Sequence, residues 1–331
     1  MQTANQLDLI SIGDSTIDTF IKIHDARVEC DINQQDCKIC FAYGSKIPVD
    51  GIAYGVAGDA ANVAVGVAKL GFKSAIYTNL GDDTQGKTIL EAFEKEGVNT
   101  KYVKVDPDKK SNLSVVLTFQ GERTIFVYHQ DWSYHLPNLE KTSWVYLTSM
   151  AETFTNSNIM NEVVNFVEKT QAKLVYCPGT YQLKADVKRY PRILERCEAL
   201  IVNLEEAKRI LGIAQTQMSE VRDLVAGLLL LGPKKIVITD GANGSYAADG
   251  HTNLKIGAVP TEVVERTGAG DAYASGFLAA LIAGHDMGEA MVWGAINAAS
   301  VIGHIGTQVG LLGADALKKQ RQELKLKPVE F

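Results

Sequence analysis

The segment TGAGD at residues 267–271 has the residue types that phosphoryl transfer requires. The small residues Gly268, Ala269 and Gly270 let backbone N–H groups approach an anion, and the apolar segment that follows predicts a helix. A helix N-terminus favours negative charge, so this turn could bind phosphate oxygens during transfer. Asp271 opens the helix and could take a proton from an attacking hydroxyl. The competing interpretation is a simple helix cap.

A second glycine-rich segment, GDDTQGKT at residues 81–88, matches the phosphate-binding pattern G-x-x-x-x-G-K-[ST]. It lies between a predicted strand and a predicted helix, and IVITD, ending at Asp240, could be the metal-binding strand of such an NTPase. However, Asp82 and Asp83 would place two carboxylates in a loop that must hold anionic phosphates. We therefore favour a glycine turn with Lys87 in the first turn of a helix.

A third polar turn, AGDAAN at residues 57–62, leads into a helix rich in Ala and Val. Asp59 and Asn62 could form hydrogen bonds with a polyol. A helix cap explains the same residues, and for this motif alone it is the simpler interpretation.

The composition is that of a globular protein. The chain has 331 residues, of which 46% are hydrophobic and 22% charged, and its net charge is -6. We find no cluster of Lys and Arg for nucleic acid, no apolar stretch of about 20 residues for a membrane span, and no signal peptide. We therefore expect a cytoplasmic protein that binds neither nucleic acid nor membranes.

The chain contains five cysteines, an odd number, which together with the missing signal peptide predicts reduced thiols. Cys37 and Cys40 form a C-x-x-C pair, with Cys30 upstream. A zinc site would need a fourth ligand, for which His24 is the candidate. The alternative is that these cysteines are small residues in or beside a strand.

The hydrophobic pattern predicts one α/β domain that spans residues 1–331. From residue 144 on, predicted strands and helices alternate strictly, which is typical of a parallel sheet covered on both faces. The first third is rich in strands, with a predicted hairpin at residues 113–128. This part indicates a small β appendage on the α/β body.

Four motifs, in order, resemble the signatures of the ribokinase family, also called the pfkB family of carbohydrate kinases. AGDAANVAVGVAKLG resembles the first signature, whose usual form is G-G-x-x-x-N, and GDDTQG resembles the G-x-D-x-x-G turn. NLEE at residues 203–206 is similar to the N-x-x-E motif, and TGAGDAYASGF resembles the C-terminal signature. In addition, ITDGANGSYAAD is similar to the nucleotide-side strand and turn of that family.

The resemblance implies a Rossmann-like, doubly wound α/β fold with a mostly parallel sheet and a small β lid, formed from about residues 14–56 and 100–132. It implies an ATP-dependent kinase that phosphorylates a hydroxymethyl group of a small sugar or sugar derivative. Asp271 would be the general base, and the backbone of Gly268, Ala269 and Gly270 would form the anion hole. ATP chemistry also implies Mg²⁺, which neutralises phosphate charge.

The resemblance implies further site residues by their positions in the motifs. The substrate would be bound by Asp18, Gly58, Asp59 and Asn62. ATP would lie near Asn203, Thr239, Gly241 and Asn297. Glu206 would hold Mg²⁺ through water.

Four departures from the family pattern affect these expectations. Ala57 replaces the first glycine of the first signature. Glu265 replaces an aspartate that commonly belongs to a monovalent-cation site in K⁺-activated members, so Glu265 is a candidate K⁺ ligand and K⁺ activation stays open. Arg266 is a large cation beside the phosphate site that either contacts phosphate or faces solvent. The insert with Cys30, Cys37 and Cys40, in the lid region, is also longer than expected.

Two alternatives to a sugar kinase remain open. Aromatic residues in FVYHQDWSY, residues 126–134, could stack on a nucleobase, as expected for an adenosine-type nucleoside kinase, although lid-strand and dimer contacts explain them as well. A non-catalytic sugar- or nucleotide-binding regulator is the alternative of another class, and the presence of Asp271 with both glycines argues against it. Exposed strand edges in the lid predict a homodimer through the lid.

Overall fold

The computed structural model of the protein describes residues 6–31, 37–120 and 122–331. In this part of the chain the central sheet has the following strands, in their order across it: β17 (Val329–Glu330), β16 (Asn253–Ile256), β15 (Ser245–Ala248), β14 (Ile236–Thr239), β13 (Cys197–Asn203), β12 (Lys173–Tyr176), β11 (Thr142–Leu147), β1 (Leu7–Ile12) and β6 (Ser74–Tyr77). The strands from β14 to β6 pair in parallel, and β15 to β17 are antiparallel. The predicted mostly parallel α/β fold is therefore confirmed.

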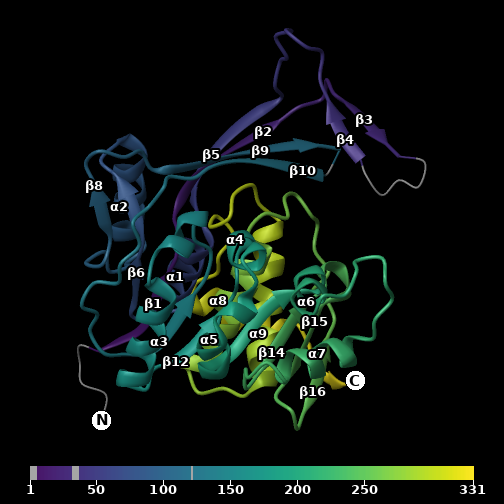
Figure 1. Cartoon of the computed structure of the whole chain (residues 1–331). Coiled ribbons are helices and arrows are strands. Elements are labelled where there is room, and N and C mark those ends of the chain that lie inside the picture. Colours follow the sequence, from purple (N-terminus) through teal and green to yellow (C-terminus); the bar gives the residue numbers. More distant parts are fainter. Residues whose placement is uncertain (1–5, 32–36, 121) are drawn as a thin grey trace.

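Helices cover both faces of the sheet. Successive side chains of a strand point to opposite faces, so each strand contributes to a core on either side. Ile10 and Leu174 pack on one face in a core cluster whose helices are α3 (Ile159–Thr170), α4 (Thr180–Lys184), α5 (Pro191–Arg196), α6 (Leu204–Leu211) and α7 (Val221–Leu229). Leu9 and Val175 pack on the other face, against α1 (Asp59–Lys69), α8 (Ala269–Ile282), α9 (Met287–Ile302) and α10 (Ala314–Glu323). Figure 1 shows the resulting layered body.

A second sheet, here called the lid sheet, lies above the body in Figure 1. Its strands, in order, are β10 (Glu122–Tyr128), β9 (Asn112–Phe119), β2 (Thr16–Lys22) and β5 (Gly51–Ala57). β9 and β10 form the predicted hairpin, whose link includes Gly121, outside the described residues. Because β2 follows β1 after only three residues, the lid sheet is attached at the carboxyl edge of the central sheet.

Smaller elements complete the fold. α2 (Thr84–Lys95) packs near α1, and a two-stranded ladder beside it joins β7 (Asn79–Gly81) to β8 (Lys104–Asp106). Short helical turns occupy Glu152–Asn156, Val187–Arg189 and Gly241–Asn243. No helix of the described residues is long and apolar enough to cross a membrane. Residues 1–5, part of the segment in which we expected no signal peptide, lie outside the described part.

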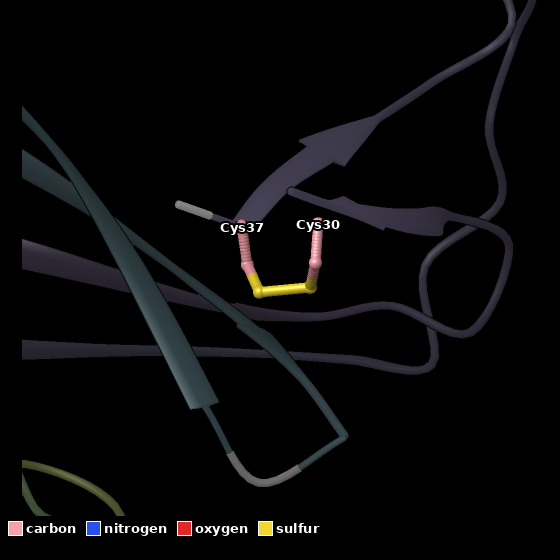
Figure 2. The surroundings of a disulfide bond; sticks show 2 residues. All are labelled: Cys30 and Cys37. Atoms are coloured by element: carbon pink, nitrogen blue, oxygen red, sulfur yellow. A yellow bond between two sulfur atoms is a disulfide. The ribbon is translucent and has the colours of Figure 1, made fainter. Parts of the chain in front are cut away.

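The expectation of reduced thiols is wrong for two cysteines of the lid region. β3 (Arg27–Cys30) and β4 (Cys37–Cys40) form an antiparallel hairpin in which Cys30 and Cys37 are directly opposite and joined by a disulfide (Figure 2). Hairpin register, rather than the C-x-x-C spacing, therefore decides which cysteines meet. Cys40 carries a free thiol, and His24 contacts Asp50 at 2.5 Å. Among the described residues no metal-binding group of three or more side chains is present, so the zinc alternative has no support.

Candidate active site

The candidate site lies where the carboxyl ends of the parallel strands meet the lid sheet. Asp14 follows β1 and Ser149 follows β11, while Asn203 ends β13 and pairs in register with Thr239 at the end of β14. In doubly wound sheets this edge is where ligands bind. The topology therefore brings the predicted substrate and nucleotide residues to one edge of the molecule.

The predicted anion-binding turn precedes α8. Gly268 is the N-cap of this helix with φ 84°, and a Cβ there would lie 2.7 Å from the Cβ of Thr307. Glycine is therefore required both by the left-handed backbone and by the close neighbour. A Cβ added to Gly270 would have no neighbour within 4 Å, and Asp271 lies in the first helical turn. Asp271 thus lies at a helix N-terminus, where backbone N–H groups lack intrahelical partners. Of the predicted anion hole, the N–H of Ala269 donates to the carbonyl oxygen of Arg266 at 3.3 Å.

Asn62 holds the carboxylate of Asp271 in place. Its Nδ2 donates a hydrogen bond to Asp271 Oδ2 at 2.7 Å. Its Oδ1 accepts from Thr307 Oγ1 at 2.9 Å and from Gln308 Nε2 at 3.0 Å. These two donors set which side of the amide faces Asp271. The contact joins α1 to α8 across 209 positions of sequence, so Asp271 does more than cap its own helix.

Gly58 brings the start of α1 against the end of β1. Its φ is 100°, and a Cβ there would lie 2.6 Å from the carbonyl oxygen of Asp14. The adjacent Asp59 accepts a short hydrogen bond from Ser149 Oγ. The predicted substrate-side turn therefore contacts two strand ends of the central sheet.

Carboxylates gather at this edge, and their surroundings raise their pKa values. Burial, followed by the charge of Asp59, raises the pKa of Asp271 well above its ordinary value, with the Asn62 hydrogen bond opposing the shift. Burial raises the pKa of Asp18 from 3.8 to about 7, partly opposed by a hydrogen bond from Ser114. The pKa of Asp59 is raised as well, chiefly by burial. A raised pKa makes a carboxylate a stronger base, which suits a group that accepts a proton.

Sequence reasoning missed Asp14 and the residues around it. Asp14 is buried and accepts hydrogen bonds from Tyr134 Oη at 2.7 Å and from the backbone N–H of Ala151 at 2.8 Å. Burial raises its pKa to about 7. His129 Nδ1 lies 4.0 Å from Asp14, and burial lowers the pKa of His129. The available signal was an aspartate directly after a buried strand.

The nucleotide-side residues occupy the ends of β13 and β14. Asn203 and Glu206 form a capping box at the start of α6, with Asn203 Oδ1 accepting from Glu206 N at 2.8 Å and Glu206 Oε2 accepting from Asn203 N at 2.9 Å. Burial raises the pKa of Glu206, and its charge in turn raises the pKa of Asp271. Gly241, two residues after Thr239, has φ 51°. One acidic side chain thus lies near the transfer site, which fits Mg²⁺, an ion that keeps its waters and uses few carboxylates.

Asn297 lies apart from the open edge. It is fully buried, and its Nδ2 donates to Ala272 O and Ser275 Oγ at 3.0 and 2.9 Å. Its Oδ1 accepts from the backbone of Leu312 at 3.0 Å. The described contacts of this side chain therefore tie α9 to α8, and its contact with ATP stays a prediction.

Glu265 organises the loop before the anion-binding turn. Its Oε1 accepts from the backbone N–H groups of Arg266 and Thr267 and from Thr267 Oγ1, at 2.7 to 3.0 Å. Its Oε2 accepts from Thr118 Oγ1 of the lid sheet at 3.2 Å. The Arg266 guanidinium is exposed and lies 3.7 Å from Glu122 of β10. These contacts join the loop to the lid, and the K⁺ role of Glu265 stays a prediction.

The Walker-like segment has a structural explanation. Asp83 caps α2 by accepting from Gly86 N at 2.8 Å, and it also accepts from the backbone and hydroxyl of Ser111. These bonds hold the pKa of Asp83 below its usual value, although partial burial opposes them. Lys87 pairs with Asp82 at 3.2 Å. A charged aspartate thus occupies the place that a phosphate would take.

The Phe, Tyr and Trp rings of residues 126–134 are either buried or turned away from Asp18. Trp132 and Tyr134 are buried, and their polar atoms are bonded to Asn112 and Asp14. Phe126 and Tyr128 are exposed on the face of the lid sheet opposite to Asp18, as the strand register shows. The base-stacking hypothesis for this segment therefore loses its geometric basis.

Comparison with known proteins assigns the class. A family model described as pfkB family carbohydrate kinase matches residues 21–312. The chain is therefore a phosphotransferase with an alcohol group as acceptor. It belongs to the pfkB family of carbohydrate kinases.

Individual relatives agree with this assignment. The chain is 26% identical to the ATP-dependent 6-phosphofructokinase of Thermoanaerobacterium thermosaccharolyticum over 298 residues, which cover 86% of this chain and 90% of that relative. It is 26% identical to the 5-dehydro-2-deoxygluconokinase of Bacillus subtilis over 264 residues, which cover 75% and 80%. Among solved structures, Arabidopsis thaliana ribokinase in complex with ribose and ATP superposes with a TM-score of 0.78 at 21% identity, covering 95% of this chain and 98% of that one. The ribokinase-like fold is thereby confirmed.

Proposed function

We propose that this protein transfers the γ-phosphoryl group of ATP to a hydroxymethyl group of a small sugar, with Asp271 as the general base. The observation that carries the proposal is the Asn62–Asp271 hydrogen bond at 2.7 Å at the N-terminus of α8. In this arrangement Asp271 accepts a proton, while the N-terminus of α8 attracts the negative charge of the transferred phosphoryl group.

The other site residues take supporting roles in this proposal. Asp18 and Asp59 accept hydrogen bonds from substrate hydroxyls, and Gly58 lets the chain approach the substrate closely. Asn203, Thr239 and Gly241 border the nucleotide, at the ends of β13 and β14. The lid sheet excludes water, which limits wasteful hydrolysis of ATP.

Two ions belong to the proposal. Glu206 would hold Mg²⁺ through water, and the ion would supply charge neutralisation of the phosphates. Glu265 is the candidate residue for a monovalent cation, and its carboxylate already orders the loop before Gly268. A K⁺ ion near this loop would change the activity through its effect on the anion hole that follows the loop.

An ATP-consumption assay with Mg²⁺ tests the function directly. We would measure turnover against a panel of sugars and nucleosides, with and without K⁺. The proposal expects turnover of at least one sugar. Turnover of nucleosides alone would replace it with a nucleoside kinase, and ATP binding without turnover of any member would favour the non-catalytic regulator.

We also propose that the protein forms a homodimer through the lid. Ile52 and Tyr54 of β5 and Phe126 and Tyr128 of β10 are exposed, and strand register places all four on the face opposite to Asp18. Both strands are edge strands of the lid sheet. Exposed apolar side chains beside unpaired edges favour pairing with a second copy.

A further inference from the structure

The side chain of Glu265 joins the lid sheet to the turn before α8. It is buried, with 7% of its surface exposed. Its Oε1 accepts from the N–H groups of Arg266 and Thr267 and from Thr267 Oγ1, and its Oε2 accepts from Thr118 Oγ1 at 3.2 Å. A carboxylate has about four acceptor positions, so these bonds satisfy it. Thr118 is the donor that comes from the lid.

The main chain of the same loop is fixed from the other side by α9. The N–H groups of Val264 and Glu265 donate to the carbonyl oxygen of Ile302 at 2.8 and 3.1 Å. The main chain of Glu265 is therefore attached to the body, whereas its carboxylate reaches the lid sheet. A change at Thr118 would turn the side chain of Glu265 rather than displace its main chain.

The carboxylate of Glu265 also orients the peptide groups that lead into the predicted anion hole. Its Oε1 holds the N–H groups of Arg266 and Thr267 at 2.9 and 3.0 Å. The carbonyl oxygen of Arg266 in turn accepts from the N–H of Ala269 at 3.3 Å. A continuous series of hydrogen bonds thus runs from Thr118 of the lid sheet to Ala269 at the start of α8.

Other contacts between the lid sheet and this loop involve exposed groups. The Arg266 guanidinium lies 3.7 Å from Glu122, and both side chains are exposed. Exposed ion pairs contribute little to stability. Arg123 and residues 263–266 line a common cavity. The Thr118–Glu265 hydrogen bond, which has a buried carboxylate as acceptor, is therefore the contact that we expect to hold the loop.

Thr118 lies away from the proposed substrate residue of the lid sheet. Asp18 is opposite Ser114 in the register of β2 and β9, and Thr118 is four residues further along β9. That separation corresponds to about 13 Å along an extended strand. A substitution of Thr118 should therefore leave the binding of a small sugar at Asp18 intact.

We propose that Thr118 is a positioning residue for phosphoryl transfer, which fixes the predicted anion hole through the carboxylate of Glu265. This inference rests on the kinase function proposed above. Donors that stabilise the transferred group must be oriented before the reaction, because a small displacement removes much of their effect. The hydroxyl of Thr118 supplies this orientation, so the geometry of the turn at residues 267–271 depends on the place of the lid sheet.

Thr118→Val tests the inference, because it removes the hydroxyl and keeps the shape of the side chain. With a sugar that the wild type phosphorylates, kcat should fall by about 10-fold or more, while KM for that sugar changes by less than about 3-fold. Amide hydrogen exchange of residues 265–270 should become faster, because the lid no longer holds Glu265. Thr118→Ser keeps the donor and should retain wild-type kcat and exchange. Thr124→Val, on the opposite face of the lid sheet, is the matched control and should change neither quantity.

The outcomes separate this inference from the kinase proposal. Wild-type kcat in Thr118→Val, an equal loss of kcat in Thr118→Ser, or a loss of kcat without faster exchange overturns the inference. If the wild type phosphorylates no sugar, the kinase proposal fails and amide exchange alone decides. Faster exchange in Thr118→Val but not in Thr118→Ser then supports the link from the lid to the turn, and unchanged exchange overturns it. If Thr118→Val does not fold, Thr118→Ala takes its place with the same expected results.

Discussion

Asn62 links the catalytic carboxylate to the rest of the candidate site. Its hydrogen bond to Asp271 favours the ionised carboxylate and so lowers the pKa of Asp271. In Asn62→Ala that pKa should rise, so the acidic limb of the kcat–pH profile should move to higher pH. Turnover should fall about 10²-fold, since the base loses its orientation.

The kcat–pH profile distinguishes a role of Asn62 in positioning Asp271 from a role in folding. Asn161→Ala, on an exposed position of α3, is the matched control and should leave both turnover and profile unchanged. A loss of turnover in Asn62→Ala with an unshifted acidic limb would contradict the role given to this hydrogen bond.

The raised pKa values of Asp14 and Asp18 predict how the stability of the fold depends on pH. Burial raises the pKa of both carboxyls from 3.8 to about 7, so between these values the folded state holds protons that the unfolded state has lost. The free energy of unfolding should therefore fall as pH rises from about 4 to 7, by at most about 4 kcal/mol for each group. Asp18→Asn should flatten this dependence and stabilise the protein at pH 8.

Urea unfolding at pH 5 and pH 8 checks the expectation. Asp223→Asn, on exposed surface, should retain the wild-type difference between the two pH values. The assigned pKa direction would be wrong if Asp18→Asn showed the same difference as the wild type.

At the scale of elements, the N-terminus of α8 depends on Gly268. Alanine there meets both the positive φ of 84° and Thr307, so the anion-binding turn should shift. Gly284, at the other end of α8, also has positive φ, but a Cβ added there would have no neighbour within 4 Å. Each alanine variant should cost about 1 kcal/mol or more of stability, but only Gly268→Ala should lose most of its turnover.

Thermal unfolding and turnover, measured together, make this comparison. Equal losses of turnover in Gly268→Ala and Gly284→Ala would show that helix strain, rather than the geometry of the anion-binding turn, controls activity.

Local patterns predicted most elements of the body, because a buried parallel strand or an amphipathic helix is a property of adjacent residues. The glycine-rich turn at 267–271 and Asp271 could be found in the same way. The partners of these residues could not. Asn62 meets Asp271 only through the packing of α1 on α8, and Tyr134 meets Asp14 only because the chain returns from the lid. Such contacts depend on tertiary structure.

The register of the β3–β4 hairpin could not be predicted from the sequence either. Sequence spacing suggested Cys37 with Cys40, whereas the pairing of β3 and β4 places Cys30 opposite Cys37. Hydrophobic periodicity sets the register of a hairpin only where one face is buried. Both faces of this hairpin are largely exposed, so its register could not be deduced from the sequence.

At the scale of the whole molecule, the exposed face of the lid sheet predicts a dimer. Tyr54→Glu combined with Phe126→Glu places charges on that face and should convert a dimer to a monomer in light scattering coupled to size-exclusion chromatography. Met218→Glu, on a side chain that is 97% exposed outside the lid sheet, should leave the mass unchanged. A wild-type protein that is monomeric at all concentrations would contradict the dimer proposal.

The most direct test of the whole account is the turnover of Asp271→Asn with a sugar that the wild type phosphorylates. The amide keeps the size of the side chain and cannot accept the substrate proton, so kcat should fall by about 10³-fold or more, while ATP affinity stays close to wild type. Asp223→Asn serves as the control. Full turnover in Asp271→Asn would show that another group is the base, and it would contradict the central claim.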